Sequence, residues 1–183
     1  MSTHIMVDIE TLGVDNAPPV LQIAAMEFDL DTGTVYETFN QVADITSLKN
    51  VSMDTLDWWL RTAPMVLSEL SQKGEETEKE LICNFVQWLN TKIDVFLWGN
   101  GILFDNRILN EKCAEYGLTY PVRYSNDMDM RTIVQVAAYK KGMNTQWEFR
   151  ESIPFEGNPH DAEADVKHQI KCVCAAYKLL TNN

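Results

Sequence analysis

Basic side chains are scarce in this sequence of 183 residues. There are 15 Lys and Arg against 27 Asp and Glu, which gives a formal net charge of −12 at pH 7. Affinity for long duplex nucleic acid comes largely from Lys and Arg that neutralise phosphates, so this balance disfavours a long-duplex binder. Only residues 107–150 carry an excess of basic side chains, with 7 Lys and Arg against 5 Asp and Glu.

Long apolar runs are also absent. No stretch approaches the roughly 20 apolar residues of a membrane span, and we find neither an N-terminal secretion signal nor a lipidation motif. We therefore expect a cytoplasmic protein with no membrane partner. Hydrophobic residues make up 45% of the chain, and there is no internal repeat or long linker. This composition predicts one domain with one core over residues 1–183.

Cysteine is limited to Cys83, Cys113, Cys172 and Cys174. The last two could be interpreted as a metal site together with His168. Two of these residues, His168 and Cys172, stand one helical turn apart, but Cys174 lies two residues further and faces away. A single helix cannot bring all three to one zinc ion, so we predict reduced thiols in the core.

Hydrophobic periodicity and turn residues predict an α/β fold. We expect strands near 4–9, 20–30 and 34–41 in a meander, and then alternating helices and strands. These follow as helices near 52–61 and 77–90, a strand near 95–98, a helix near 105–116, a strand near 122–128 and helices near 131–141 and 161–180. The helix starts include Ser52 and a capping box, Thr77-x-x-Glu80. The order predicts a mixed five-stranded sheet flanked by helices. Segment 142–159 is expected to be a substrate-contacting loop.

Acidic residues stand at the ends of several predicted elements. Asp8 and Glu10 close the first strand, whose period of two places both carboxylates on one face. Two like charges about 4 Å apart repel by roughly 4 kcal/mol at an effective dielectric of about 20, so such a pair needs cations or protons. Asp105 opens a helix, and Asp165 lies in the first turn of the last helix, after His160.

Each of these features alone has an ordinary structural interpretation. Acids at a strand end can simply be solvated, an acid at a helix start can cap the helix or interact with its dipole, and a histidine before a helix can lie on the surface. Asp161, for example, is a good N-cap candidate. It is the combination of all three sites in one chain that indicates a metal site.

Together these residues carry a resemblance to a known superfamily. The chain resembles the DEDDh (DnaQ-like) 3'-5' exonucleases in three motifs: Asp8-x-Glu10-Thr11, Asn100-x-x-x-Phe104-Asp105 and His160-Asp161-Ala162-x-x-Asp165. The motifs occur in order and span nearly the whole chain. Within this superfamily the chain is most similar to the short phage and bacterial branch of Rv2179c-like exoribonucleases and phage exonuclease A. The paired Trp58-Trp59 fits that branch.

The resemblance implies a ribonuclease H-like fold and two-metal hydrolysis of the terminal phosphodiester, with release of nucleoside monophosphates. It implies that Asp8, Glu10 and Asp165 hold the metal that activates the attacking water. Asp8 and Asp105 would hold the second metal, and His160 would be the general base. Because the ligands are all oxygen atoms, Mg²⁺ or Mn²⁺ is favoured over zinc. The expected substrate-binding residues are Thr11, Leu12, Asn100 and Phe104, with Leu12 packing on the terminal base.

The implied partner is the 3' end of single-stranded DNA or RNA, and the motifs do not choose between the two, because the 2'-hydroxyl is read by local contacts. Relatives often dimerise, so a homodimer is a further expectation. Two other hypotheses remain open. One is a catalytically silent nucleic-acid-binding or regulatory homologue, which the intact motif set disfavours. The other is an unrelated protein that binds divalent cations without cutting nucleic acid.

Two pairs of residues can be interpreted in more than one way. Asp127 and Asp129 repeat the same-face acid pair, but Asp129 is well placed to cap the helix at Arg131, so we expect this pair to lie away from the metals. Trp58 and Trp59 point about 100° apart on a helix. They can form a base-stacking platform or pack in the core against the sheet, and because both cannot do the same job, we expect one to be buried and the other to lie near the surface.

Overall fold

The computed structural model describes residues 2–182 and contains one five-stranded sheet in the order β3-β2-β1-β4-β5. The strands are β1 (Thr3–Thr11), β2 (Val20–Phe28), β3 (Val35–Val42), β4 (Val95–Gly99) and β5 (Asp127–Asp129). The first three strands pair antiparallel, and β4 and β5 continue the sheet parallel to β1. The predicted meander and mixed five-stranded sheet are confirmed.

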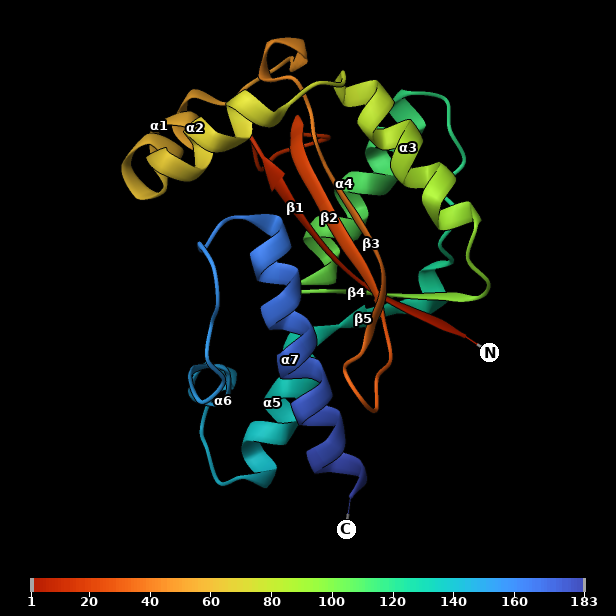
Figure 1. Cartoon of the computed structure of the whole chain (residues 1–183), viewed down its shortest axis with the longest axis vertical. Helices are drawn as coiled ribbons and strands as arrows, with labels where there is room; N and C mark the ends of the chain where they lie inside the picture. Colours follow the sequence, from red (N-terminus) through yellow and green to blue (C-terminus); the bar gives the residue numbers. More distant parts are fainter. Residues whose placement is uncertain (1, 183) are drawn as a thin grey trace.

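Helices cover both faces of this sheet (Figure 1). They are α1 (Met53–Thr62), α2 (Pro64–Lys73), α3 (Glu78–Asn90), α4 (Ile102–Glu115), α5 (Met130–Lys140), α6 (Gln146–Glu151) and α7 (Ala162–Thr181). The pair α3 and α4 lies on one face and the pair α5 and α7 on the other, while α1 and α2 lie over one end of the sheet. Within residues 2–182, no helix has the length and apolar character that crossing a membrane requires.

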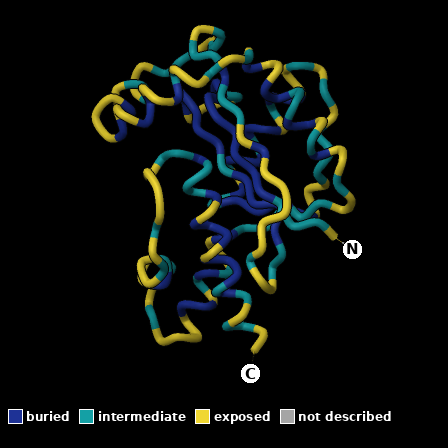
Figure 2. Tube along the Cα trace, in the orientation of Figure 1, coloured by how far each residue is buried: buried dark blue, intermediate teal, exposed yellow. Residues whose placement is uncertain are grey.

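The central strand β1 divides the core into two layers. Its residues Ile5, Val7 and Ile9 pack with α3 and α4, whereas Met6 packs with α5 and α7. Figure 2 shows that β1 and β2 form the buried centre of the molecule, whereas β3 is largely exposed at the edge of the sheet. Because side chains alternate along a strand, Asp8 and Glu10 share the α7 side with Met6, as the sequence predicted.

The predicted order of elements needs correction at three places. The strand expected over 122–128 is reduced to β5, because residues 124–126 form a 3-10 turn and only residues 127–129 pair with β4. Helix α2 was not predicted, although Pro64 suits its first turn, where the missing N–H has no intrahelical partner. The expected loop 142–159 contains α6, which Thr145 caps by accepting the backbone N–H of Glu148.

Several local predictions are confirmed. Ser52 and Asp161 cap α1 and α7 through their side chains, and Thr77 and Glu80 form the reciprocal capping box of α3. The four cysteines are free and three of them are buried. No cluster of metal-ligand residues within positions 2–182 includes a cysteine.

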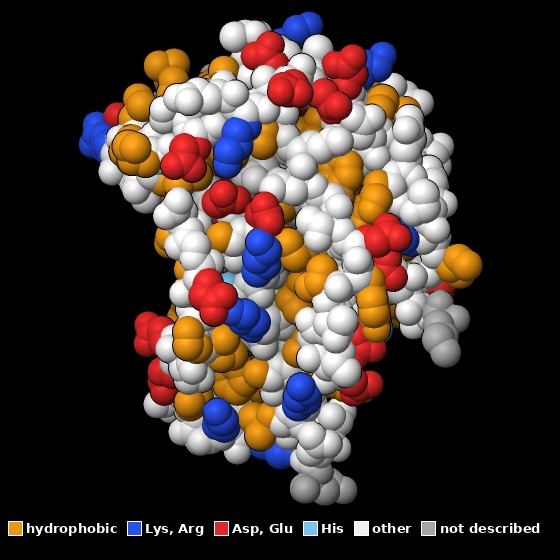
Figure 3. All heavy atoms as spheres, in the orientation of Figure 1, with side chains coloured by type: hydrophobic (Ala, Val, Ile, Leu, Met, Phe, Trp, Pro, Cys, Tyr) orange, Lys and Arg blue, Asp and Glu red, His pale blue; other side chains and the backbone are white. Residues whose placement is uncertain are grey.

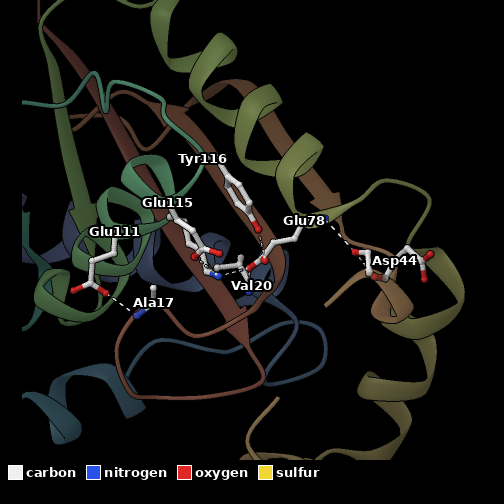
Figure 4. Close-up of polar contacts among 9 residues, drawn as sticks. Ala17, Val20, Asp44, Glu78, Glu111, Glu115 and Tyr116 are labelled. Carbon is white, nitrogen blue, oxygen red and sulfur yellow. Dashed lines mark hydrogen bonds and ion pairs between the residues drawn. The ribbon is translucent and has the colours of Figure 1, made fainter. Parts of the chain in front are cut away.

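A buried ion pair connects α3 and α4 beneath the loop that follows β1. Lys112 and Glu78 are each nearly inaccessible, and their Nζ and Oε1 atoms lie 3.0 Å apart. Glu78 also accepts the backbone N–H of Val20 at 2.7 Å, and Glu111 accepts that of Ala17 at 2.9 Å (Figure 4). These carboxylates hold the second half of the loop 12–19, which begins directly after the acidic end of β1.

Candidate active site

The ends of three elements bring the predicted acidic residues together. Asp8 and Glu10 lie near the carboxyl end of β1, and Asp105 lies in the first turn of α4, directly after β4. Asp165 lies in the first turn of α7. Open α/β sheets bind ligands outside the carboxyl ends of their parallel strands, and β1 and β4 are such a pair. The three sequence motifs therefore meet at the carboxyl ends of β1 and β4.

The tightest part of the site combines two carboxylates and one imidazole. Ligand atoms of Glu10, His160 and Asp165 all lie within 4.8 Å of one another. Asp105 is held on the other side of β1, where its Oδ1 accepts the backbone N–H of Ile9 at 3.3 Å. The structure thus places Asp105 next to β1 but outside the three-residue group.

The remaining carboxylate, Asp8, is oriented by an amide. Its Oδ1 accepts a hydrogen bond from Nε2 of Gln169 at 2.7 Å, one turn beyond Asp165 on α7. None of the four carboxylates forms an ion pair with Lys or Arg in the part of the chain that the structure describes. The negative charges of these carboxylates are therefore available to bind a metal cation.

Burial and mutual repulsion disfavour the ionised state of these acids. Burial raises the pKa of Asp8 well above its usual range, and the charges of Asp105 and Asp165 raise it further. Burial raises the pKa of Glu10 well above its usual range, and the charge of Asp8 raises it further. Burial raises the pKa of Asp105 to about 7 and also raises that of Asp165. Divalent cations would remove this repulsion and displace the protons. An all-oxygen carboxylate set of this kind fits Mg²⁺ or Mn²⁺.

His160 has a fixed and strained position. Its φ of +67° lies in the left-handed region that residues other than glycine rarely adopt. Its backbone N–H donates to Oδ2 of Asp165 at 2.9 Å. The imidazole packs edge-on against Trp58, with the ring centres 5.0 Å apart, and against Trp59 at 6.2 Å. Such strain costs about 1–3 kcal/mol and is typical of functional sites.

A cleft of about 380 Å³ adjoins the carboxylates. Trp59 is buried and ties α1 to β1 by donating its Nε1–H to the carbonyl of Thr11 at 3.0 Å, while Trp58 is 43% exposed. The expected division between one buried and one surface tryptophan is confirmed. The cleft is lined mostly by apolar and aromatic side chains: Ile9, Glu10, Thr11, Val14, Asp54, Thr55, Trp58, Trp59 and Phe104.

The four expected substrate-binding residues are not all in this cleft. Thr11 and Phe104 line it. The expectation for Leu12 is corrected, because its side chain is only 1% exposed and packs under α1 and α2, where it cannot stack on a base. Asn100 lies between two arginines, Arg131 and Arg150, and donors of both guanidinium groups contact its amide oxygen.

The second acid pair lies outside the site, as expected. Asp127 accepts a hydrogen bond from Asn106. Asp129 does occupy the N-cap position of α5, but its carboxylate does not cap that helix. It accepts instead the backbone N–H of Gly101 at 3.2 Å and the hydroxyl of Thr132 at 2.8 Å.

Sequence reasoning missed two buried amides that support the site. Gln22 on β2 accepts the N–H of Ala162 at 3.1 Å and donates to Asp161 at 3.3 Å, so it holds the start of α7 against the sheet. Gln169 orients Asp8. Both were detectable as polar residues in otherwise apolar patterns, and Gln169 also lies one turn from Asp165 on the same helix face.

Known structures share this fold across nearly the whole chain. The nuclease domain of 3'hExo, a DEDDh family member bound to rAMP, matches with a TM-score of 0.62 at 15% identity, over 98% of this chain and 92% of that one. Exonuclease I from Methylocaldum szegediense matches with a TM-score of 0.70 at 14% identity, over 100% of this chain and 41% of that one. The zinc-bound E. coli ExoI–ssDNA complex matches with a TM-score of 0.67 at 17% identity, over 98% and 40%.

These likenesses identify a ribonuclease H-like fold, and the chain spans about two fifths of the length of the exonuclease I structures. A search of curated proteins found no match. The fold and the family model together place the protein in the class of 3'-5' exonuclease domains with a ribonuclease H-like fold. The profile of the 3'-5' exoribonuclease Rv2179c-like domain matches residues 3–177, and the chain belongs to that family.

Proposed function

We propose that residues 1–183 act as one exonuclease domain that removes nucleoside monophosphates stepwise from the 3' ends of single-stranded RNA. The observation that carries the proposal is the group of Glu10, His160 and Asp165, with the carboxylates of Asp8 and Asp105 near it and an open aromatic cleft beside it. We assign RNA and not DNA as the substrate because the family is described as a 3'-5' exoribonuclease domain. The low content of Lys and Arg favours short single-stranded ends over duplexes.

The four carboxylates are the proposed metal ligands. Asp8, Glu10 and Asp165 would hold one Mg²⁺ or Mn²⁺ ion, and Asp8 and Asp105 a second. Two bound ions of this kind lower the pKa of a water molecule and stabilise both the attacking and the leaving oxygen of the phosphodiester. The raised pKa values of all four acids support this assignment. Burial disfavours their negative charges, and a bound cation would compensate for this.

The remaining residues would place the substrate and move one proton. The imidazole of His160 would accept the proton of the attacking water, and its packing against Trp58 and Trp59 holds the ring beside Glu10. The cleft would take the terminal nucleoside, with Trp58 and Phe104 as apolar surfaces for the base.

One digestion experiment tests the activity and its polarity. A 5'-labelled single-stranded RNA and a DNA of the same sequence are incubated with the protein in Mg²⁺, Mn²⁺, Ca²⁺ or chelator. We expect a stepwise ladder on RNA with Mg²⁺ or Mn²⁺ only, and resistance of an RNA with a 3'-phosphate. Early internal fragments would identify an endonuclease instead, and faster cleavage of DNA would reverse the assigned substrate.

Two controls separate the alternatives. Asp8→Ala should lose cleavage and lower the affinity for Mn²⁺ in calorimetry, and equal Mn²⁺ binding by both proteins would contradict the ligand assignment. Binding of RNA without cleavage in any metal would favour the catalytically silent homologue. Light scattering of the purified protein tests the homodimer that the resemblance suggests.

A further inference from the structure

Two arginines beside the site differ from the others in the chain. The sequence contains five arginines, and three of them form ion pairs with carboxylates: Arg61 with Asp57, Arg107 with Glu111 and Arg123 with Asp94. Arg131 and Arg150, here called the arginine pair, have no carboxylate within ion-pair distance among residues 2–182. No carboxylate among the described residues forms an ion pair with either of these two arginines.

The pair is brought together by one amide. Nε of Arg131 donates to Oδ1 of Asn100 at 3.3 Å, and Nη1 of Arg150 donates to the same atom at 3.4 Å. These residues come from three elements, because Asn100 follows β4, Arg131 opens α5 and Arg150 lies on α6. Like charges repel, so a neutral acceptor shared between two guanidinium groups is the feature that keeps them adjacent.

Neighbouring residues shape the surroundings of the pair. A Cβ atom at Gly101, whose φ is +94°, would lie 2.9 Å from Cζ of Arg131, so the missing side chain leaves room for this guanidinium. The guanidinium of Arg150 lies over the ring of Trp147, with 4.8 Å from Cζ to the ring centre. Phe149, which is 2% exposed, anchors α6 in the core with α5 and α7. Trp147 and the anchored helix α6 therefore support Arg150, and Asn100 beside Gly101 receives Arg131.

The pair lies near the carboxylates but outside the cleft. A Cβ atom at Gly99 would lie 3.2 Å from Oδ2 of Asp105, and one at Gly101 would lie 2.9 Å from Cζ of Arg131. Asn100, which holds the pair, thus lies between a glycine that contacts a carboxylate of the site and a glycine that contacts an arginine of the pair. Neither arginine lines the cleft beside Glu10 and Trp58. In Figure 1, α1 and α6 lie on the same side of the molecule, with the start of α7 between them.

This arrangement fits a bound phosphate. A guanidinium has five N–H donors in a planar fork that matches two phosphate oxygens, and Asn100 uses one donor of each arginine. On the face drawn in Figure 3, acidic and basic side chains are interspersed, and several of the basic ones lie along α7, where Lys167 and Lys171 pair with Glu163 and Glu156. A chain with a net charge of −12 needs such a local cationic site to hold a polyanion.

We propose that Arg131 and Arg150, held side by side by Asn100, form a subsite for the internucleotide phosphate on the 5' side of the bond that is cleaved. The proposal rests on the exonuclease function given above. The terminal nucleoside enters the cleft beside Trp58, the scissile phosphate lies at the carboxylates, and the next phosphate reaches the arginine pair. A substrate with an upstream phosphate therefore binds more tightly than a single nucleotide, which has no phosphate for the arginine pair.

Two substrates separate this subsite from the catalytic centre. The p-nitrophenyl ester of uridine 5'-monophosphate contains only the scissile phosphate, whereas a single-stranded hexanucleotide also has upstream phosphates. For Arg131→Gln/Arg150→Gln we expect KM for the hexanucleotide to rise at least about tenfold, because the variant loses the charged hydrogen bonds to the upstream phosphate, which are stronger than neutral ones. Hydrolysis of the ester should stay within about threefold of wild type, a change too small for the removal of a charged hydrogen bond.

The matched control is Arg123→Gln, which removes the same charge from an exposed arginine that already pairs with Asp94 at the opposite end of β4. It should leave both substrates unaffected, and unfolding temperatures check that all variants are folded. An unchanged KM for the hexanucleotide in the double variant would overturn the proposal. An equal loss on both substrates would also overturn it, since the arginines would then act at the scissile phosphate.

A binding readout keeps the subsite testable apart from cleavage. Fluorescence anisotropy of a labelled hexanucleotide in Ca²⁺ measures the dissociation constant over a salt series. The double variant should bind at least about tenfold more weakly, with a salt slope shallower by about 0.7 for each phosphate that the arginines no longer neutralise. A wild-type protein that binds but does not cleave would contradict the exonuclease function while still testing the subsite. Wild-type salt dependence in the double variant would overturn the subsite.

Discussion

Replacement of Asp105 by Asn should stabilise the metal-free protein at neutral and alkaline pH while abolishing cleavage. The carboxyl group is 4% exposed, and burial raises its pKa to about 7. Asn carries no charge, has nearly the same shape and can still accept the backbone N–H of Ile9 that now bonds to Asp105. The substitution therefore removes a buried charge without removing the hydrogen bond.

The pH dependence follows from proton binding. In the unfolded chain this carboxyl group loses its proton near pH 3.9, whereas in the folded protein it keeps the proton up to about pH 7. Between these values the folded state binds more protons, so the free energy of unfolding falls as pH rises and levels off above about pH 7. A shift of about 3 units at about 1.4 kcal/mol each sets an upper limit of roughly 4 kcal/mol.

We therefore expect Asp105→Asn to gain about 1–4 kcal/mol at pH 8, which corresponds to an increase in Tm of at least about 2–4 °C for a chain of this length. Circular dichroism in chelator at pH 5 and pH 8 measures this. Wild type should lose stability between the two values, and the variant should lose less. Added Mg²⁺ or Mn²⁺ should stabilise wild type more than the variant. Asp15→Asn, an exposed loop position, is the matched control. A variant less stable than wild type at pH 8 without metal would refute the reasoning.

Three further predictions test other parts of the site and the fold. His160→Ala should lose roughly 10²–10⁴ in kcat with KM and Mn²⁺ affinity little changed, and a loss below about threefold would show that another group takes the proton. Trp58→Ala should lower kcat/KM by about 5–150-fold, the equivalent of roughly 1–3 kcal/mol of stacking, while Leu60→Ala on the exposed part of α1 should not. Wild-type kcat/KM in Trp58→Ala would exclude that ring from the substrate site. Lys112→Met should destabilise the protein by about 3–5 kcal/mol in urea unfolding because it leaves Glu78 buried and unpaired, and a cost below about 1 kcal/mol would contradict this.

Features set by local patterns were predictable from the sequence. The alternation in β1 placed Asp8 and Glu10 on one face, and the polar residues Ser52, Thr77 and Asp161 marked helix starts that the structure confirms. Both kinds of signal depend on side chains within a few residues of each other, where backbone geometry fixes the outcome. The three motifs could be joined only through the resemblance, because nothing local brings β1 and α7 together.

Features set by tertiary packing were not predictable in the same way. Segment 142–159 is rich in turn residues, yet burial of Phe149 among α5 and α7 supports the short helix α6. Leu12 follows the first motif directly, but the packing of α1 and α2 over the sheet decides that it is buried. The strand near 122–128 is short because residues 124–126 form a 3-10 turn, so that only residues 127–129 pair with β4. For α6 and Leu12, a distant segment determines the local result.

The way the acids are held explains how the site keeps its affinity for cations. Three of the carboxylates accept hydrogen bonds from neutral donors: Asp8 from the Gln169 amide, Asp105 from the Ile9 N–H and Asp165 from the His160 N–H. Neutral donors orient a carboxylate without cancelling its charge, whereas a guanidinium within ion-pair distance would compete with a metal. Asn100 provides the arginine pair with an uncharged acceptor, so both positive charges remain near the acids without pairing with them. The same amide thus serves both the metal site and the proposed phosphate subsite, and Asn100→Asp, which adds a carboxylate to the arginine pair, should weaken hexanucleotide binding more than Asn100→Ala.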